Sequence, residues 1–397
     1  MLQDTEEAAV PWKETCVMDQ REAFVSDWLA RKSTLSALCE GYGISRKTGS
    51  KWVQRFYEGG RGGLVDRSRR PLRIPHRVTA EVAEAVVGAR KKHPLWGPKK
   101  LRAWLERKDP DTSWPAPSTI GLLLKERGLI AERRKRLRTP RSSEPLSAAT
   151  EPNITWCTDF KGCFRVDGKY CHPLTISDGF SRYLLCVQAV KAEKAEFVMP
   201  QFERVFREYG LPLRMRSDNG APFASKAVGG LSRLSVWWIK LGITPERIDP
   251  GSPQQNGRHE RMHRTLKDAT ARPPRDDAAA QQRAFDEFRE CYNQERPHEA
   301  LANQTPASVY RPSTRPFPVE LSDPEYPNVF EVRRTNKKGL MNLFGGYALL
   351  SAVLADEVIG IEAVDDGRWR LWFGPIYLGL LSKEGRGRLE FLKNESK

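Results

Sequence analysis

The spacing of apolar residues predicts short helices in the first third of the chain. Over 21–32, Phe24 and Trp28 recur at a helical interval and share one side. A second short helix is expected over 34–40. Ser45, which follows a glycine-containing break, has the side chain of an N-cap for a third, basic helix. Two helices joined by a turn, the second of them basic, are typical of a helix-turn-helix unit, predicted here over 17–73.

The basic helix has the residue types that contact DNA. In a helix-turn-helix unit, the N-terminal residues of this helix reach base edges in the major groove. We therefore expect DNA contacts from Arg46, Lys47, Ser50 and Lys51. The alternative is an ordinary helical hairpin whose basic side chains are simply solvated.

A second helix-turn-helix unit is predicted over 74–141, with helices at 78–92, after the Gly97-Pro98 break and at 119–127. It ends in a run of eleven residues with six basic ones. We expect contacts with the DNA backbone from Arg133, Arg134, Lys135 and Arg136. A solvated linker is the plainer interpretation of that run. Residues 142–153, rich in Ser, Pro and Ala, are predicted to be a flexible linker.

The composition of the chain changes at Ile154. We expect three consecutive strands, with Asp167-Gly168 as the hairpin turn between the first two. The elements expected next are a helix at 193–209, strands at 212–217 and 243–248, and helices at 255–270 and 285–293. This order predicts a mixed α/β domain with a ribonuclease H-like sheet over 154–312.

The last part of the chain is predicted to be a β-domain. Five prolines between 311 and 327 indicate a linker, and 328–397 contains short alternating strands with Asp366-Gly367 at a hairpin tip. The predicted fold class is therefore multidomain, α + α/β + β. It comprises tandem helix-turn-helix units, a ribonuclease H-like mixed-sheet core and a small C-terminal β-barrel.

The charge of the chain points to a polyanionic partner. The net charge is +16, from 66 Lys and Arg against 50 Asp and Glu. Residues 1–150 hold 30 basic and 18 acidic residues, a net +12, which leaves +4 for the rest. Positive charge concentrated in the part that carries the predicted helix-turn-helix units favours double-stranded DNA as the partner.

Other features of the composition exclude some classes of protein. No run of eighteen apolar residues occurs, so no membrane partner is expected, and the acidic N-terminus is unlike a secretory signal. The seven cysteines include no C-x-x-C pair, which favours a reducing cytoplasm over a disulfide framework. The same lack of paired Cys ligands argues against a structural zinc site.

Three carboxylates stand out by position. Asp159 lies inside a probable central strand, where an unpaired charge is costly. Asp218 ends a later strand, and ligands gather at strand ends in open α/β sheets. Glu260 lies on the helix 255–270. Taken singly, 218–220 (Asp-Asn-Gly) is also good turn chemistry and Glu260 could merely pair with Arg264.

Helical periodicity groups further candidates with Glu260. One polar face is predicted to carry Asn256, Glu260, His263, Arg264 and Lys267, and the buried face Met262, Leu266 and Ala269. Hard oxygen ligands without thiolates suit Mg²⁺ or Mn²⁺. Three carboxylates can hold two such ions around a phosphodiester, with Lys267 as a phosphate contact. His259 and His263 are expected to support the site or face DNA rather than bind zinc.

The motifs WCTDF, SDNGAPF and SPQQNGRHERMHRTLK together resemble the integrase catalytic core of DDE transposases. The segments GGLVDRSRRP (62–71) and YNQERPHEALANQTPASVY (292–310) are also similar to segments of bacterial insertion-sequence transposases. The resemblance extends over nearly the whole chain, from about residue 18 to 389.

The resemblance implies a core that cuts DNA at element ends, after which the freed 3′ hydroxyl attacks target DNA. It implies that Asp159, Asp218 and Glu260 are a catalytic, metal-binding triad, with Mg²⁺ the expected ion. The helix-turn-helix units would recognise terminal repeats, and the chain would act as a homodimer or larger assembly at the bacterial nucleoid. Supporting roles are expected for Asn219, Asn256 and Gly257.

One departure from the family concerns spacing. Forty-one residues separate Asp218 from Glu260, more than is common in the family. The excess, around 226–238, includes Trp237 and Trp238 and is expected to cover the core or meet a second subunit. Two other functions stay open: a non-catalytic sequence-specific DNA-binding protein derived from a transposable element, and a structure-selective nuclease on the same fold.

Overall fold

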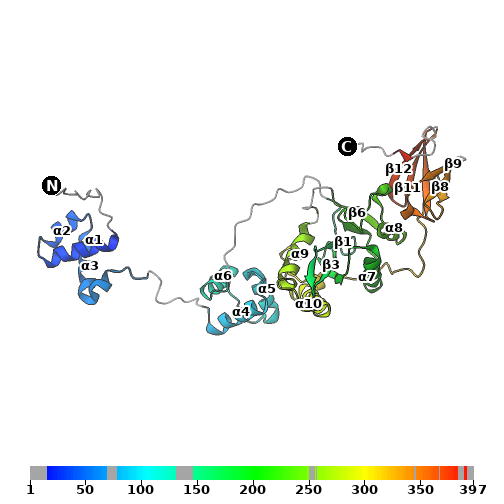
Figure 1. The fold of residues 1–397 in the computed structure, drawn as a ribbon. Helices are drawn as coiled ribbons and strands as arrows, with labels where there is room; N and C mark the ends of the chain where they lie inside the picture. Colours follow the sequence, from blue (N-terminus) through cyan, green and yellow to red (C-terminus); the bar gives the residue numbers. More distant parts are fainter. Residues whose placement is uncertain are drawn as a thin grey trace, which may run out of the picture. The chain divides into compact units, whose positions relative to one another are not determined.

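The computed structural model describes residues 16–68, 78–130, 146–249, 255, 257–343, 346–365, 367–382 and 389–390 (Figure 1). The chain divides into two compact units, Met1–Arg77 and Val78–Lys397. The finer predicted division, into 17–73, 74–141, 142–153, 154–312 and 328–397, stays a prediction. None of the helices in the described ranges has the length and apolar character needed to cross a membrane.

The first unit is a three-helix domain. Its helices are α1 (Val17–Leu29), α2 (Leu35–Gly41) and α3 (Arg46–Gly59). As predicted, the Ser45 side chain caps α3 by accepting a hydrogen bond from the Thr48 backbone N–H. Phe24 and Trp52 are buried at the centre. A Cβ at position 49 would collide with Cys39 and Phe24, so Gly49 lets α3 approach its neighbours closely.

The second unit begins with another group of three helices. These are α4 (Ala80–Lys92), α5 (Pro98–Lys108) and α6 (Pro117–Glu126). Both α5 and α6 begin with a proline, whose fixed φ suits the first turn of a helix. Val86, Leu101 and Leu124 are fully buried between them.

A mixed sheet forms the centre of the second unit. Its strands are β1 (Thr155–Phe160), β2 (Phe164–Val166), β3 (Lys169–Asp178), β4 (Leu184–Val190), β5 (Arg214–Ser217) and β6 (Thr244–Arg247). They lie in the order β4, β3, β1, β5, β6, and β2 extends the sheet beside β3. β3 is antiparallel to its neighbours, and β1, β5 and β6 are parallel. This order and these directions are those expected of the ribonuclease H-like sheet.

The strand predicted over 154–166 is in fact two strands. The chain turns at Gly162, whose φ of 68° is freely available only to glycine, and β2 then pairs with β3. The predicted hairpin turn is present: Asp167 and Gly168 have φ values of 50° and 69°, as a two-residue hairpin turn requires.

Four helices accompany the sheet: α7 (Ala195–Tyr209), α8 (Arg233–Lys240), α9 (Gly257–Thr270) and α10 (Ala278–Glu290). Shorter helical turns follow at Cys291–Glu295, Glu299–Leu301 and Pro306–Val309. The helix predicted at 285–293 therefore begins earlier, because Asp277 caps it through the Ala280 backbone N–H.

Helix α8 lies in the segment expected to cover the core or meet a second subunit. Trp238 is fully buried in the core of the sheet domain, with ring contacts to Phe202 and Phe223. The first of the two expectations is therefore correct. On the other side of α8, Val236 and Ile239 pack against the C-terminal strands.

The C-terminal strands are β7 (Glu331–Arg334), β8 (Leu340–Leu343), β9 (Gly346–Leu349), β10 (Val358–Asp365), β11 (Arg368–Phe373), β12 (Ile376–Ser382) and β13 (Leu389–Glu390). They form an open five-stranded sheet, β13-β12-β11-β10-β7, and a separate pair, β8-β9. The predicted β-barrel is not confirmed. Closure would require the edge strands β7 and β13 to pair, and in the described residues they do not.

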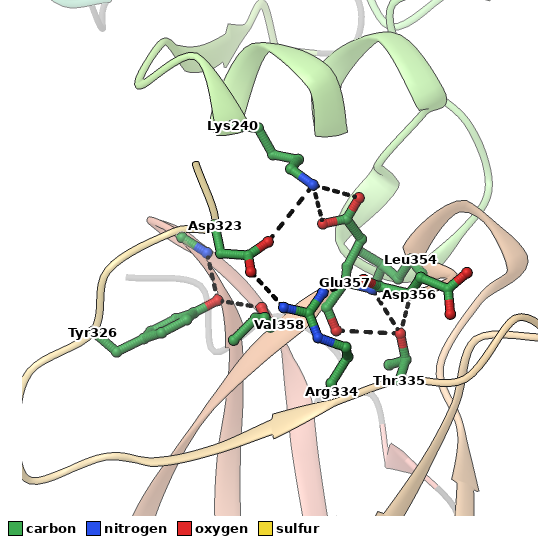
Figure 2. Close-up of polar contacts among 10 residues, drawn as sticks. Lys240, Asp323, Tyr326, Arg334, Thr335, Leu354, Asp356, Glu357 and Val358 are labelled. Atoms are coloured by element: carbon green, nitrogen blue, oxygen red, sulfur yellow. Dashed lines mark hydrogen bonds and ion pairs between the residues drawn. The ribbon is translucent and has the colours of Figure 1, made fainter. Parts of the chain in front are cut away.

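The proline-rich segment predicted to be a linker is docked on the protein. Its Arg315 side chain donates hydrogen bonds to backbone carbonyls of Pro212 and Gly242. Figure 2 shows the Tyr326 hydroxyl donating to the Val358 carbonyl, at 2.7 Å. Prolines disfavour regular elements in this segment, but its side chains still form hydrogen bonds with the neighbouring backbone.

Candidate active site

The sheet topology brings Asp159 and Asp218 to one edge. Asp159 is the fifth residue of β1, and Asp218 follows directly after β5. The two strands are parallel neighbours, with Cys157 opposite Arg216. Their carboxyl ends therefore lie together, as ligand-binding residues do in open α/β sheets. Glu260 is exposed in the first turn of α9.

The charges of Asp218 and Glu260 both act on the carboxyl group of Asp159. Its side chain is 22% exposed. Burial, followed by the negative charge of Asp218 and more weakly that of Glu260, raises its pKa to about 7, against the opposing effects of the Phe160 backbone N–H and Lys161. Such mutual repulsion is what a bound cation would relieve.

A buried polar cluster fixes α9 to the sheet behind these carboxylates. Thr175 lies opposite Asp159 in the antiparallel pairing of β1 and β3. Its hydroxyl donates to the Asp159 carbonyl at 2.9 Å and contacts Nε2 of His259 at 2.7 Å and of His263 at 2.6 Å. Ser177 contacts Nδ1 of His259 at 3.0 Å. Four side chains thus join β3 and α9.

The number of donors and acceptors in this cluster assigns the imidazole tautomers. The Thr175 hydroxyl has one hydrogen, which goes to the Asp159 carbonyl, so both histidines donate to its oxygen through Nε2. Burial lowers the pKa of both imidazoles, that of His259 to about 3, and keeps them neutral. Nδ1 of His263 is then an acceptor that faces Oδ2 of Asp159 at 3.6 Å.

This cluster corrects one expectation. His263 was expected on the exposed polar face of the helix with Glu260, but it is 4% exposed and faces Thr175. Met262 and Leu266 are buried as predicted, whereas Ala269 is exposed. The buried stripe of α9 therefore includes two neutral histidines. Thr175 was missed, and the signal for it was its place on the strand next to Asp159.

The remaining predicted residues of the core differ in their placement. Arg264 and Lys267 are exposed on α9. Asn219 is also exposed, and its side chain donates to the Ile248 carbonyl at 2.7 Å, which ties two loops at the sheet edge. Gly257 is the first residue of α9. Asn256 lies outside the described residues.

The residues predicted to contact DNA in the first unit share one end of a helix. Arg46, Lys47, Ser50 and Lys51 are all exposed in the N-terminal half of α3. Lys51 also lies over the ring of Trp52, 4.4 Å from its centroid. The basic run that contains Arg133, Arg134, Lys135 and Arg136 lies outside the described ranges.

Comparison with known families assigns the regions that carry these residues. Two models described as integrase core domain match residues 149–253 and 241–306. A helix-turn-helix domain matches 20–71, and a homeodomain-like domain matches 48–124. The chain therefore contains an integrase core domain preceded by helix-turn-helix domains.

Longer parts of the chain are similar to proteins of insertion elements. The chain is 26% identical over 247 residues to the 39.2 kDa protein of insertion element IS476 of Xanthomonas euvesicatoria, covering 62% of this chain and 69% of that protein. It is 24% identical to the transposase InsD of insertion element IS2-9 of Escherichia coli K12, covering 72% and 95%.

Among solved structures, the HTLV-2 integrase catalytic core domain in complex with magnesium matches with a TM-score of 0.33 and 17% identity, covering 41% of this chain and all of that one. The sequence comparisons confirm the resemblance to insertion-element transposases with a retroviral-integrase-like core.

Proposed function

We propose that this protein is a DNA transposase that binds the terminal repeats of a mobile element and joins their ends to target DNA. The observation that carries the proposal is the placement of Asp159 and Asp218 at the ends of two adjacent parallel strands, with Glu260 on α9 near enough for its charge to raise the pKa of Asp159. Residue 260 is the last of the three in the chain and the most exposed.

The residues fit a divalent cation. Asp159, Asp218 and Glu260 offer hard oxygen donors, the type that Mg²⁺ and Mn²⁺ prefer, and they repel one another when no cation is bound. We expect them to hold two Mg²⁺ or Mn²⁺ ions. Bound there, the ions would activate an attacking oxygen and stabilise the leaving one in an in-line displacement at phosphorus.

The other side chains of the core then act by positioning. Gly220 donates its backbone N–H to Oδ1 of Asp218 at 3.0 Å, which fixes that carboxylate at the strand end. The Thr175 cluster holds α9, and with it Glu260, against the sheet. Lys267 and Arg264 present exposed cations on the same helix for the DNA backbone.

The helix-turn-helix units would supply recognition of DNA. The exposed end of α3 carries Arg46, Lys47, Ser50 and Lys51, a set that can reach base edges and phosphates. Two element ends must be brought together for joining, so we expect a homodimer or a larger assembly on DNA. The basic run at 133–136 would add contacts with the backbone.

The test is strand transfer. Purified protein, labelled DNA carrying the terminal repeats, a plasmid target and Mg²⁺ are combined with the wild type, with Glu260→Gln and with Glu287→Gln, which removes an exposed carboxylate of α10. We expect joined product from the wild type and Glu287→Gln but none from Glu260→Gln. If the wild type and both variants bind the repeats but none joins them to the target, a non-catalytic DNA-binding protein is favoured instead. If the wild type cuts the DNA without joining it, a nuclease is favoured.

A further inference from the structure

A basic pocket of about 360 Å³ lies beside α9, between the second helix-turn-helix region and the catalytic core. Its charged lining comes from α5, from the turn between β3 and β4, from α9 and from the segment after α10. The cations are Lys100, Arg182, Arg258, Arg261, Arg264 and Arg296. Glu299 is the only carboxylate among the lining residues, and it also pairs with Lys99 at 3.6 Å.

The pocket is on a different side of α9 from Glu260. At about 100° per residue, Arg258, Arg261 and Thr265 form a stripe that lies about 100–160° around the helix from Glu260. Arg264 lies between that stripe and the Glu260 side. Helix α9 therefore carries the proposed catalytic carboxylate, Glu260, on one face and forms a wall of the basic pocket with a neighbouring face.

The gathered cations repel one another. Burial lowers the pKa of Lys100 to about 8, and the charges of Arg296 and Arg182 add to this effect, with Glu299 opposing it. The pKa of Arg182 is also lowered, first by burial and then by Arg258. Like charges brought together at partial burial destabilise a protein unless an anion compensates them.

Hydrogen-bond donors in the pocket lack partners in the part of the chain that the structure describes. These are Nε of Arg182 and Nε of Arg296, and the buried ring nitrogen Nε2 of His298 also lacks a partner there. His298 is only 8% exposed, and burial with the neighbouring cations lowers its pKa to about 3, so it is a neutral imidazole. Buried donors are normally satisfied, and two guanidinium donors together call for an acceptor.

We propose that this pocket binds a phosphate group of the DNA backbone. The proposal rests on the proposed function, because it takes DNA as the ligand. Guanidinium groups complement phosphate oxygens in charge and in the geometry of paired N–H donors. The size of the pocket suits a phosphate with part of the adjoining deoxyribose. A duplex contacting Arg264 and Lys267 would reach the pocket along the same helix.

Binding there has a consequence for the helix-turn-helix region. Lys100 belongs to α5, whereas Arg182, Arg258 and Arg296 belong to the core. A phosphate between them replaces repulsion by attraction, so the DNA itself would hold α5 against α9. The pocket then couples occupation of the DNA-binding surface to the orientation of the helix that carries Glu260.

The experiment uses Lys100→Gln and Arg182→Gln, with Arg283→Gln on the exposed side of α10 as the matched control. Binding of a labelled duplex is measured by fluorescence anisotropy over a series of salt concentrations without divalent ions. Each pocket variant should reduce the slope of log K against log salt by about 0.9, the value for one phosphate contact, and the control should not.

A second arm identifies the source of the phosphate and excludes a structural role. Thermal unfolding is compared in sodium phosphate and in sodium chloride of equal ionic strength. Phosphate should raise the Tm of the wild type and the control but not of the pocket variants. In chloride, Lys100→Gln should unfold at the same or a higher temperature than the wild type, because it removes a repelling charge.

Unchanged salt slopes in both pocket variants would overturn the proposal, even if phosphate still raised the Tm, since the ligand would then be a free phosphate. A lower Tm of Lys100→Gln in chloride, without any effect of phosphate on the wild type, would also overturn it. Neither arm requires catalysis. A protein that fails to join DNA but passes both would refute the proposed transposase and leave the pocket assigned.

Discussion

Neutralising Asp159 should stabilise the metal-free protein at neutral and alkaline pH. The folded protein raises the pKa of this carboxyl from 3.8 to about 7. It therefore binds the proton more tightly than the unfolded chain does. The contribution of this protonated carboxyl group to the free energy of unfolding is therefore fully present below about pH 4. It is lost as the pH rises from about 4 to about 7, and no further change is expected above that.

The magnitude follows from the same shift. A pKa change of one corresponds to about 1.4 kcal/mol, so the charged form of Asp159 destabilises the folded protein by about 4 kcal/mol at pH 8. Asp159→Asn removes that cost, so its free energy of unfolding should exceed that of the wild type at pH 8 by up to about this amount. At pH 4 the two proteins should differ little.

The assay is urea unfolding, read by pulse proteolysis of the sheet domain, in EDTA at several pH values from 4 to 8. Asp286→Asn, an exposed carboxylate of α10, is the control and should follow the wild type. Mg²⁺ added at pH 8 should stabilise the wild type and not Asp159→Asn. The reasoning is refuted if wild type and Asp159→Asn lose stability in parallel between pH 4 and 7.

Three further predictions concern packing and are checked by the same unfolding assay unless stated. Thr175→Val should cost about 3 kcal/mol, because two buried imidazoles lose their hydrogen-bond partner, while Thr175→Ser should keep most of the stability; equal losses would contradict the role of the hydroxyl group. Trp238→Ala should cost about 4 kcal/mol, because the indole is fully buried; a loss below about 1 kcal/mol would contradict this. Lys240→Met should cost about 1–2 kcal/mol, because Glu357 and Asp323 lose a partly buried cation, and it should speed limited proteolysis between residues 313 and 328; unchanged cleavage would refute the role of this contact (Figure 2).

Much of the fold could be predicted because local signals agreed with it. The Asp167-Gly168 turn between two expected strands predicts a hairpin that the structure contains. The candidate carboxylates were found in the same way, since a charge inside an apolar strand and another at a strand end are visible in the sequence. Once the strands are known to be adjacent and parallel, Asp159 and Asp218 are expected at the same edge of the sheet.

What could not be predicted depends on partners far along the chain. His263 looks like any polar residue of an amphipathic helix, and its burial follows from Thr175, which lies 88 positions earlier. The eight residues of α8 are too few for a periodic pattern to be distinguished from a loop. The docking of the segment around Arg315 likewise depends on carbonyls of Pro212 and Gly242 rather than on its own composition.

Helix α8 has a mechanical consequence. Its Trp238 belongs to the core of the mixed sheet, and its Val236 and Ile239 belong to the core of the C-terminal sheet. The two sheets therefore share a structural layer and have no hinge at this contact. A bending movement between them would pull apolar side chains out of one core or the other, so the two sheets should move together.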